Sequence, residues 1–264
     1  MARPQRIEYE GAVYHVTVRG NDRRSLFRDD ADRNRLIRIL AESVASFEIR
    51  LYLYCLMTNH VHLVVETPRA NLGRFMHRVQ TAYTVYFNHR HRRHGHLTQG
   101  RYGARLVAED AYILKLSRYV HLNPVFIASM RRRPVAERLT LLRQYPWSSY
   151  PGYIGRSRRL AFVDYAPILA MMSPDESRQA RTYRRFVEAG VSDVDAEFIE
   201  EQKASRLLCD HGALTQRQVA DLLKLRSGAA VSLQLRRLAD EARHSRPLRK
   251  QLARIREELQ NSQH

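Results

Sequence analysis

The sequence predicts an α+β fold, in which an antiparallel sheet is backed by helices on one face and an all-α C-terminal region follows. Three observations carry this prediction. Short segments in the first half alternate apolar and polar residues as strands do, amphipathic helical segments separate them, and the signals beyond about residue 162 are wholly helical. A length of 264 residues suits one large domain, or one domain with a smaller appendage.

The first predicted strand spans residues 12–19, AVYHVTVR, where successive side chains alternate between two faces. The turn-forming sequence GND at residues 20–22 ends it. Asp29 and Asp30 are suitable N-caps for a helix. The apolar residues after them recur at helical spacing: Leu36, Ile37, Leu40, Val44 and Phe47. The chain therefore opens with a strand followed by a helix.

Residues 51–66, LYLYCLMTNHVHLVVE, form the centre of the predicted sheet. They give strands at 49–57 and 60–66, joined by a turn so short that only an antiparallel hairpin fits. Side chains of the second strand alternate between two faces, one with Val61, Leu63 and Val65 and the other with His60, His62, Val64 and Glu66. We expect the first face to be core and the second to carry two imidazoles side by side.

Three further segments complete the predicted sheet region. A helix is expected over 71–91, a short strand at 105–107, and a helix over 110–122 that the sequence Asn123-Pro124 ends. The resulting order, β-α-β-β-α-β-α with a hairpin at its centre, indicates an antiparallel sheet of the ferredoxin-like type.

The C-terminal region contains a candidate helix-turn-helix at residues 215–238. Thr215 and Gln218 make a capping-box start, and a turn at 226–228 separates two apolar faces. Residues 229–239 would then enter the major groove of DNA, whereas a plain helical hairpin would only pack. The expected DNA contacts here are Arg226, Arg236 and Arg237. We expect a first domain over 1–155, a linker with connecting helices over 156–190, and a helical domain over 191–264.

Composition favours a nucleic-acid partner. The formal net charge is +18 and the sequence pI is about 10.5, with the excess spread along the chain and carried almost wholly by arginine. Genomic base composition would explain arginine over lysine but not the size of the excess. Cys55 and Cys209 lie far apart, which argues against a disulfide framework. No apolar stretch suits a membrane span or a signal peptide, so we expect a cytoplasmic, nucleoid-associated protein without a membrane partner.

His60 and His62 form a candidate metal site. Two residues at positions i and i+2 of a strand lie about 6 to 7 Å apart on one face, close enough for their imidazoles to share one ion. A single histidine in such a strand would more often be an ordinary packed residue. Imidazole alone does not select the metal, so the ion must be inferred from the chemistry that it serves.

Two motifs resemble a known family. TNHVHLVVE at residues 58–66 looks like the histidine-hydrophobe-histidine signature of HUH nucleases, and LSRYVHLNPV at 116–125 resembles the nucleophile helix of single-tyrosine HUH transposases. The opening YHVTVRGNDRRSLFRDDADR and the later YPWSSY extend the resemblance over about residues 12–155. The chain is most similar to REP-associated tyrosine transposases, which act on repetitive extragenic palindromes in bacteria. This resemblance implies the HUH nuclease fold.

The resemblance also implies roles for individual residues. Tyr119 would be the nucleophile, and His60 and His62 would hold Mg²⁺ or Mn²⁺. The third ligand is open between Asn123, which lies one helical turn after Tyr119, and Glu66 or water. Attack of Tyr119 on a phosphate would give a 5′-phosphotyrosine and a free 3′-hydroxyl.

The basic loop at residues 89–105 is a further candidate DNA contact. Its expected DNA-binding residues are Arg90, Arg92, Arg93 and Arg101, with Tyr102 to stack on a base. Its four histidines lack the cysteines and the spacing of a zinc finger.

These observations together predict a metal-dependent single-strand DNA endonuclease and strand transferase, a transposase-like enzyme acting on palindromic, hairpin-forming repeats. A non-catalytic DNA-binding regulator or architectural protein is the alternative, and RNA binding is a third possibility. The sequence leaves a monomer and a homodimer equally open.

Overall fold

The computed structural model describes residues 8–107 and 110–192. Its strands are β1 (Ala12–Arg19), β2 (Arg50–Leu56), β3 (His60–Thr67) and β4 (Gly103–Val107). Its longer helices are α1 (Asp30–Phe47), α2 (Leu72–Arg90), α3 (Asp110–Leu122), α5 (Val135–Gln144) and α8 (Glu176–Ser192). Short helical turns are η1 (Asn21–Arg23), η2 (Asn123–Val125), α4 (Ala128–Arg131), α6 (Tyr150–Tyr153) and α7 (Ala166–Ala170). The expected helix-turn-helix, with Arg226, Arg236 and Arg237, lies outside the described residues.

The four strands form one antiparallel sheet in the order β2-β3-β1-β4. With α1 between β1 and β2 and α2 between β3 and β4, this is the ferredoxin-like arrangement, and the predicted α+β fold class is confirmed. The central strands β1 and β3 pair so that His60 lies opposite Arg19 and His62 opposite Thr17. Opposed residues point to the same face of a sheet, so the face of the two histidines also carries Thr17 and Arg19.

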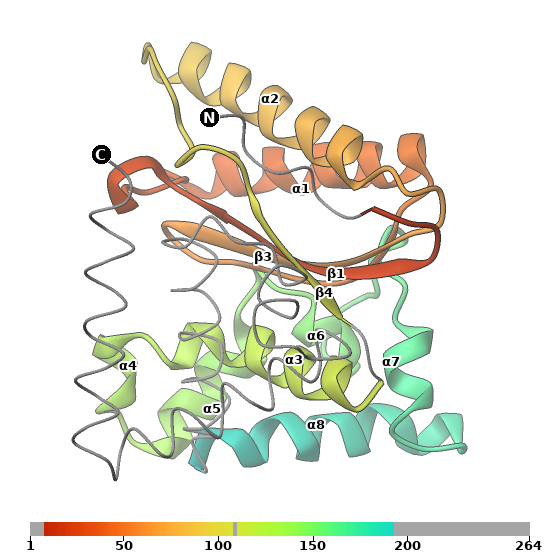
Figure 1. Cartoon of the computed structure of the whole chain (residues 1–264). Helices are drawn as coiled ribbons and strands as arrows, with labels where there is room; N and C mark the ends of the chain where they lie inside the picture. Colours follow the sequence, from red (N-terminus) through yellow and green to blue (C-terminus); the bar gives the residue numbers. More distant parts are fainter. Residues whose placement is uncertain (1–7, 108–109, 193–264) are drawn as a thin grey trace, which may run out of the picture. The chain divides into compact units, whose positions relative to one another are not determined.

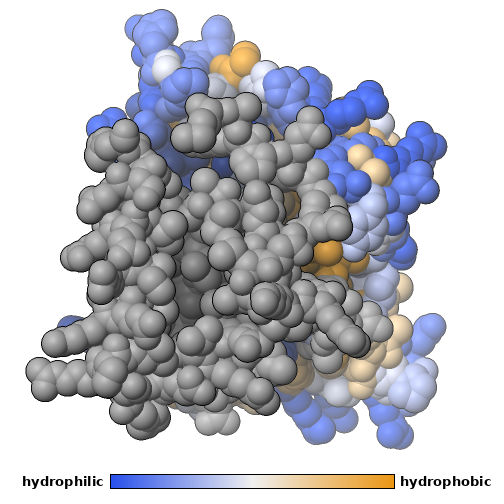
Figure 2. Space-filling view, viewed as in Figure 1, coloured by the Kyte–Doolittle hydropathy of each residue, from blue (hydrophilic) through white to orange (hydrophobic). Residues whose placement is uncertain are grey.

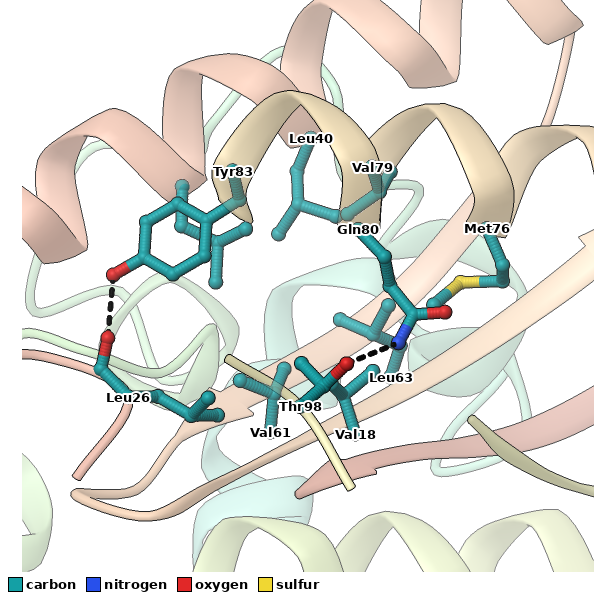
Figure 3. A pocket seen from close by; sticks show the side chains of 11 residues that line it. Val18, Leu26, Leu40, Val61, Leu63, Met76, Val79, Gln80, Tyr83 and Thr98 are labelled. Carbon is teal, nitrogen blue, oxygen red and sulfur yellow. Dashed lines mark hydrogen bonds between the residues drawn. The ribbon is translucent and has the colours of Figure 1, made fainter. Parts of the chain in front are cut away.

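Helices α1 and α2 cover one face of the sheet (Figure 1). Helix α1 begins at the predicted cap, since the Asp29 side chain accepts a hydrogen bond from the backbone N–H of Asp32. The layer beneath the two helices is apolar, and it encloses a cavity of about 20 Å³ (Figure 3). The cavity walls include Val61 and Leu63 of β3, and the phenol of Tyr83 nearby donates to the Leu26 carbonyl. A space this small, lined almost wholly by apolar side chains, is a packing gap rather than a substrate site.

Helices α3 and α5 to α8 lie on the opposite face of the sheet (Figure 1), so the expectation of helices on one face only is corrected. The physical reason is visible in β3, where Val64 shares the face of the histidines and is fully buried. Helix α8 contributes Tyr183 and Val187 to this second layer, both fully buried. Among the described residues, one compact unit runs from Glu8 through α7 and α8, and the domain boundaries at residues 155 and 190 stay a prediction.

The outer surface of the α1 and α2 layer is polar. Figure 2 shows a largely hydrophilic surface where these helices lie at the top of the view, and Arg38, Arg74 and Arg78 are exposed there. Within the described part of the chain, no helix combines the length and the apolar character needed to cross a membrane.

Candidate functional site

The hairpin between β2 and β3 is anchored at its turn. The Met57 N–H donates to the His60 carbonyl at 2.8 Å, which leaves Thr58 and Asn59 as the loop. The Asn59 carbonyl accepts from the Gly20 N–H at 2.9 Å, and its side-chain Nδ2 donates to the Arg23 carbonyl at 3.2 Å. The start of β3 is thereby held against the segment that follows β1.

The structure brings together the three residues that the sequence singles out for chemistry. The ring centroids of His60 and His62 are 4.9 Å apart, and the Tyr119 ring of α3 lies 5.8 Å from that of His62. His60 and Tyr119 are half-buried, whereas His62 is only 4 % exposed. A phenol from one layer therefore faces two imidazoles on the sheet.

A third imidazole, which the sequence reasoning did not select, completes the cluster. Nε2 of His15 on β1 lies 2.9 Å from Nδ1 of His62, and the two rings are nearly parallel, at 19°. The His15 ring also lies 6.3 Å from that of Tyr119. Burial and the neighbouring Arg105 lower the pKa of His15 to about 3, so this imidazole is neutral at pH 7. The sequence contained a weak signal for this role of His15, because the alternation of β1 places a histidine on the same face as Thr17.

The two candidates for a third ligand occupy different surroundings. The Glu66 carboxylate accepts from the Tyr52 hydroxyl and pairs with Arg50 at 3.2 Å. It lies four positions beyond His62, about 13 Å along the strand, which is too far to share an ion with it. The Asn123 amide donates to the Tyr119 carbonyl at 2.8 Å, and this leaves its Oδ1 as an acceptor on the helix end beside Tyr119.

Helix α3 is fixed in place by a buried polar network. His121 makes two hydrogen bonds, from Nδ1 with the Tyr183 hydroxyl at 2.7 Å and from Nε2 with the Ser149 hydroxyl at 2.9 Å. Burial lowers the pKa of His121 to about 3. At the end of α3, Leu122 packs closely against Gly190 of α8. A Cβ atom added to Gly190 would lie 2.8 Å from the Leu122 side chain. These contacts set the position from which Tyr119 faces the histidines.

The expected DNA-binding loop divides into buried and exposed parts. Arg90 pairs with Asp29 and with the fully buried Asp32, and this hydrogen bonding holds the pKa of Asp29 well below its usual range. The remaining loop candidates differ in their exposure: Arg93 bonds Asn88 and the His96 carbonyl, Tyr102 is 6 % exposed, and Arg92 and Arg101 are exposed. Arg90 thus fastens the start of α1 to the end of α2, a role that local basic composition does not indicate.

The donors around His60 and His62 fit a divalent cation. Nδ1 of His60 lies 2.8 Å from the Asn59 Oδ1, and Nδ1 of His62 lies 2.9 Å from His15, so a cation would be held through Nε2 of each ring. Among residues 8–107 and 110–192, no three His, Cys, Asp or Glu side chains are arranged around a common ion position. A cation here would therefore take two imidazoles, with further oxygen donors from an amide, water or substrate.

Part of the chain matches a known protein family, and some solved structures are similar to it. The family model described as IS200-like transposase matches residues 8–123. A solved structure of a REP-associated tyrosine transposase bound to a REP hairpin is 13% identical, with a TM-score of 0.48 over 63% of this chain and 96% of that one. A presumed transposase from Deinococcus radiodurans is 17% identical, with a TM-score of 0.33 over 45% and 95% of the two chains. No curated protein matches the chain.

Proposed function

Because the family model described as IS200-like transposase matches residues 8–123, we propose that this protein cleaves and rejoins single-stranded DNA at hairpin-forming repeats through Tyr119. The observation that carries the proposal is the meeting of the Tyr119 ring with His62 at 5.8 Å, beside His60. Helix α3, which carries Tyr119, lies on the face of the sheet to which the two histidines of β3 point. A phenol at this position is the only group of the cluster able to form a stable phosphodiester with DNA.

The proposed reaction is a displacement at phosphorus. The Tyr119 oxygen attacks a backbone phosphate, the bond from phosphorus to the 3′-oxygen breaks, and the phenolic proton leaves with the 3′-hydroxyl product. The 5′-phosphotyrosine conserves the phosphodiester, so attack by another 3′-hydroxyl rejoins DNA without ATP. An ordinary tyrosine has a pKa near 10 and is mostly neutral at pH 7, so the attack requires assistance.

His60 and His62 are the proposed holders of Mg²⁺ or Mn²⁺, with Asn123 as the protein oxygen best placed beside Tyr119. Such an ion would polarise the scissile phosphate and offset charge that builds in the displacement. The positive charge of Arg19 and Arg105 would assist phosphate binding, because strand register places them opposite His60 and His15 on the same face.

Exposed arginines of the loop after α2 are the proposed DNA-backbone contacts. Arg92 and Arg101 are exposed there, whereas Arg90 is engaged with two aspartates. Phosphate contacts of this kind give affinity that falls with salt and carry little sequence information. Selection of hairpin DNA would therefore require contacts other than those of Arg92 and Arg101.

The test is covalent capture. Labelled single-stranded hairpin DNA is incubated with the protein and Mn²⁺ and resolved on a denaturing gel. Wild-type protein should give a slow-migrating adduct, and Tyr119→Phe should give none. Tyr83→Phe is the matched control, since its phenol lies on the opposite face of the sheet and donates to the Leu26 carbonyl. That variant should form the adduct as wild type does.

Three results would overturn the proposal. An adduct of equal yield in Tyr119→Phe would exclude this tyrosine as nucleophile. Tight hairpin binding without any adduct in wild type would favour the non-catalytic DNA-binding protein. Tighter binding to structured RNA than to single-stranded DNA at matched salt would instead indicate an RNA partner.

A further inference from the structure

We propose that His15 is a positioning residue whose Nε2 accepts a hydrogen bond from Nδ1 of His62 and thereby reserves Nε2 of His62 for the divalent cation. The inference rests on the proposed function, because it concerns the cation of the same site. It assigns a role to a side chain on β1, a strand that contributes neither the nucleophile nor a proposed ligand.

Strand pairing brings the two rings into contact. Thr17 lies directly opposite His62, and His15 precedes Thr17 by two positions on the same face, so His15 and His62 are diagonal neighbours. Their nearest nitrogens are 2.9 Å apart, which is an ordinary hydrogen-bond distance. The small angle of 19° between the rings suits this bond, because the N–H and the lone pair of imidazole lie in the ring plane.

The other proposed ligand, His60, indicates which ring nitrogen would face the ion. The Asn59 Nδ2 donates to the Arg23 carbonyl, so its Oδ1 is the atom that faces His60, at 2.8 Å from Nδ1. Nδ1 of His60 must therefore carry the proton, and its Nε2 has the lone pair. If His62 is to coordinate the same ion through Nε2, its Nδ1 must also be a donor, and His15 is the acceptor in contact with it.

Packing alone does not explain a histidine at position 15. The side chain is 4 % exposed, and its Nδ1 has no hydrogen-bond partner within residues 8–107 and 110–192. A buried polar atom of this kind lowers stability relative to an apolar side chain of similar size. Among the described residues, the hydrogen bond to His62 is the contact of His15 that an apolar residue could not supply.

The first experiment determines the proton positions in the wild-type chain. Long-range ¹H–¹⁵N correlation spectra of metal-free protein with ¹⁵N-labelled histidine distinguish the two tautomers of each neutral ring. We expect both His62 and His15 to carry their proton on Nδ1, with peaks assigned from His15→Gln and His62→Gln. A proton on Nε2 of His62 would make His15 the donor and would overturn the proposal.

The second experiment measures Mn²⁺ affinity by electron paramagnetic resonance titration without DNA. His15→Phe keeps a ring but removes the acceptor, and we expect a 10- to 100-fold loss of affinity, about the effect of losing a partner of a metal ligand. His15→Gln restores an acceptor and should recover most of the affinity. Tyr83→Phe is the control, because that buried phenol donates to the Leu26 carbonyl on the opposite face of the sheet.

The outcomes separate the two proposals. Wild-type protein that binds no Mn²⁺ would overturn the cation site of the proposed function, while the tautomer of His62 would still decide the hydrogen bond. Equal affinity in wild type and in folded His15→Phe would overturn the role of His15 alone. If His15→Phe does not fold, equal loss of affinity in His15→Gln and Tyr83→Phe would do so, since it would mark a general effect of destabilising the fold.

Discussion

The two faces of the sheet share the same strands but bury side chains of opposite character. Toward α1 and α2, β3 sends Val61 and Leu63, and the layer beneath these helices is apolar. Toward α3, the same strand sends His60 and His62, which meet His15 and Tyr119. One strand therefore contributes to the apolar core through one set of alternate positions and to the proposed site through the other.

The polar face has an energetic cost that the apolar face must offset. Two of its imidazoles, His15 and His121, are so buried that their pKa values fall to about 3. Burying polar rings stabilises less than burying aliphatic side chains, even when the rings are hydrogen-bonded. A site of this kind is tolerated because the α1 and α2 side provides a well-packed aliphatic core.

The sharpest contrast should come from His60→Ala. Loss of a proposed ligand removes a Lewis-acid contribution of several kcal/mol, so adduct formation should fall by about 10²- to 10³-fold. His60 is half-buried, so the free energy of unfolding in urea should change by only about 1 kcal/mol. Rates of adduct formation at saturating DNA provide the measurement. A variant with near-normal rates would remove His60 from the site.

Leu63→Ala should have the opposite profile. This side chain is 1 % exposed and already borders the small cavity, so its truncation enlarges a void and should cost about 2–5 kcal/mol of unfolding free energy. Adduct formation per folded molecule should stay within a few-fold of wild type. Urea unfolding and the adduct assay on the same preparation test both statements. A large loss of chemistry at full folding would show that the two faces are coupled.

Sequence patterns revealed most of the sheet and part of the site. The alternation in β3 and the helical spacing around Tyr119 are local, so the predicted faces and elements follow from neighbouring residues alone. The element bounds agree within a few residues, as for the strand predicted at 60–66 and observed as His60–Thr67.

Contacts between distant segments could not be predicted in the same way. His15 joins the site only because β1 pairs with β3, and strand order is not visible in the periodicity of either strand. The second helical layer depends on contacts such as that of His121 with Tyr183, 62 positions away. Arg90 lies in a basic stretch typical of a DNA-binding loop. Its ion-pair partner Asp29 lies 61 positions earlier, so the local sequence does not indicate the pair.

The effect of Mn²⁺ on the unfolding free energy should differ between variants of the two faces. A ligand that binds only the folded state at 100 times its Kd adds about 2.7 kcal/mol, so Mn²⁺ should raise the unfolding free energy of wild type by roughly that amount. Leu63→Ala should keep the full increase on its lower baseline, whereas His60→Ala should lose it. Chelator should reverse the effect. An equal increase in His60→Ala would place the bound cation elsewhere.

The response of the polar face to acid gives a further contrast. His121 has a pKa of about 3 when folded against 6.5 when exposed, so between these values the unfolded chain binds a proton that the folded chain does not. Stability from this group is therefore complete above about pH 6.5 and falls by up to about 1.4 kcal/mol per unit as the pH decreases toward 3.

His121→Gln should unfold more easily at pH 7 but lose less stability between pH 6 and pH 4 than wild type, in urea titrations at each pH. Tyr83→Phe is the control from the apolar face. It removes one hydrogen bond but no group that titrates between pH 4 and pH 6, so it should lower stability by about 1 kcal/mol at every pH. Parallel pH profiles for wild type and His121→Gln would contradict the assignment. A flatter profile for His121→Gln alone would show that acid sensitivity belongs to the layer that positions Tyr119.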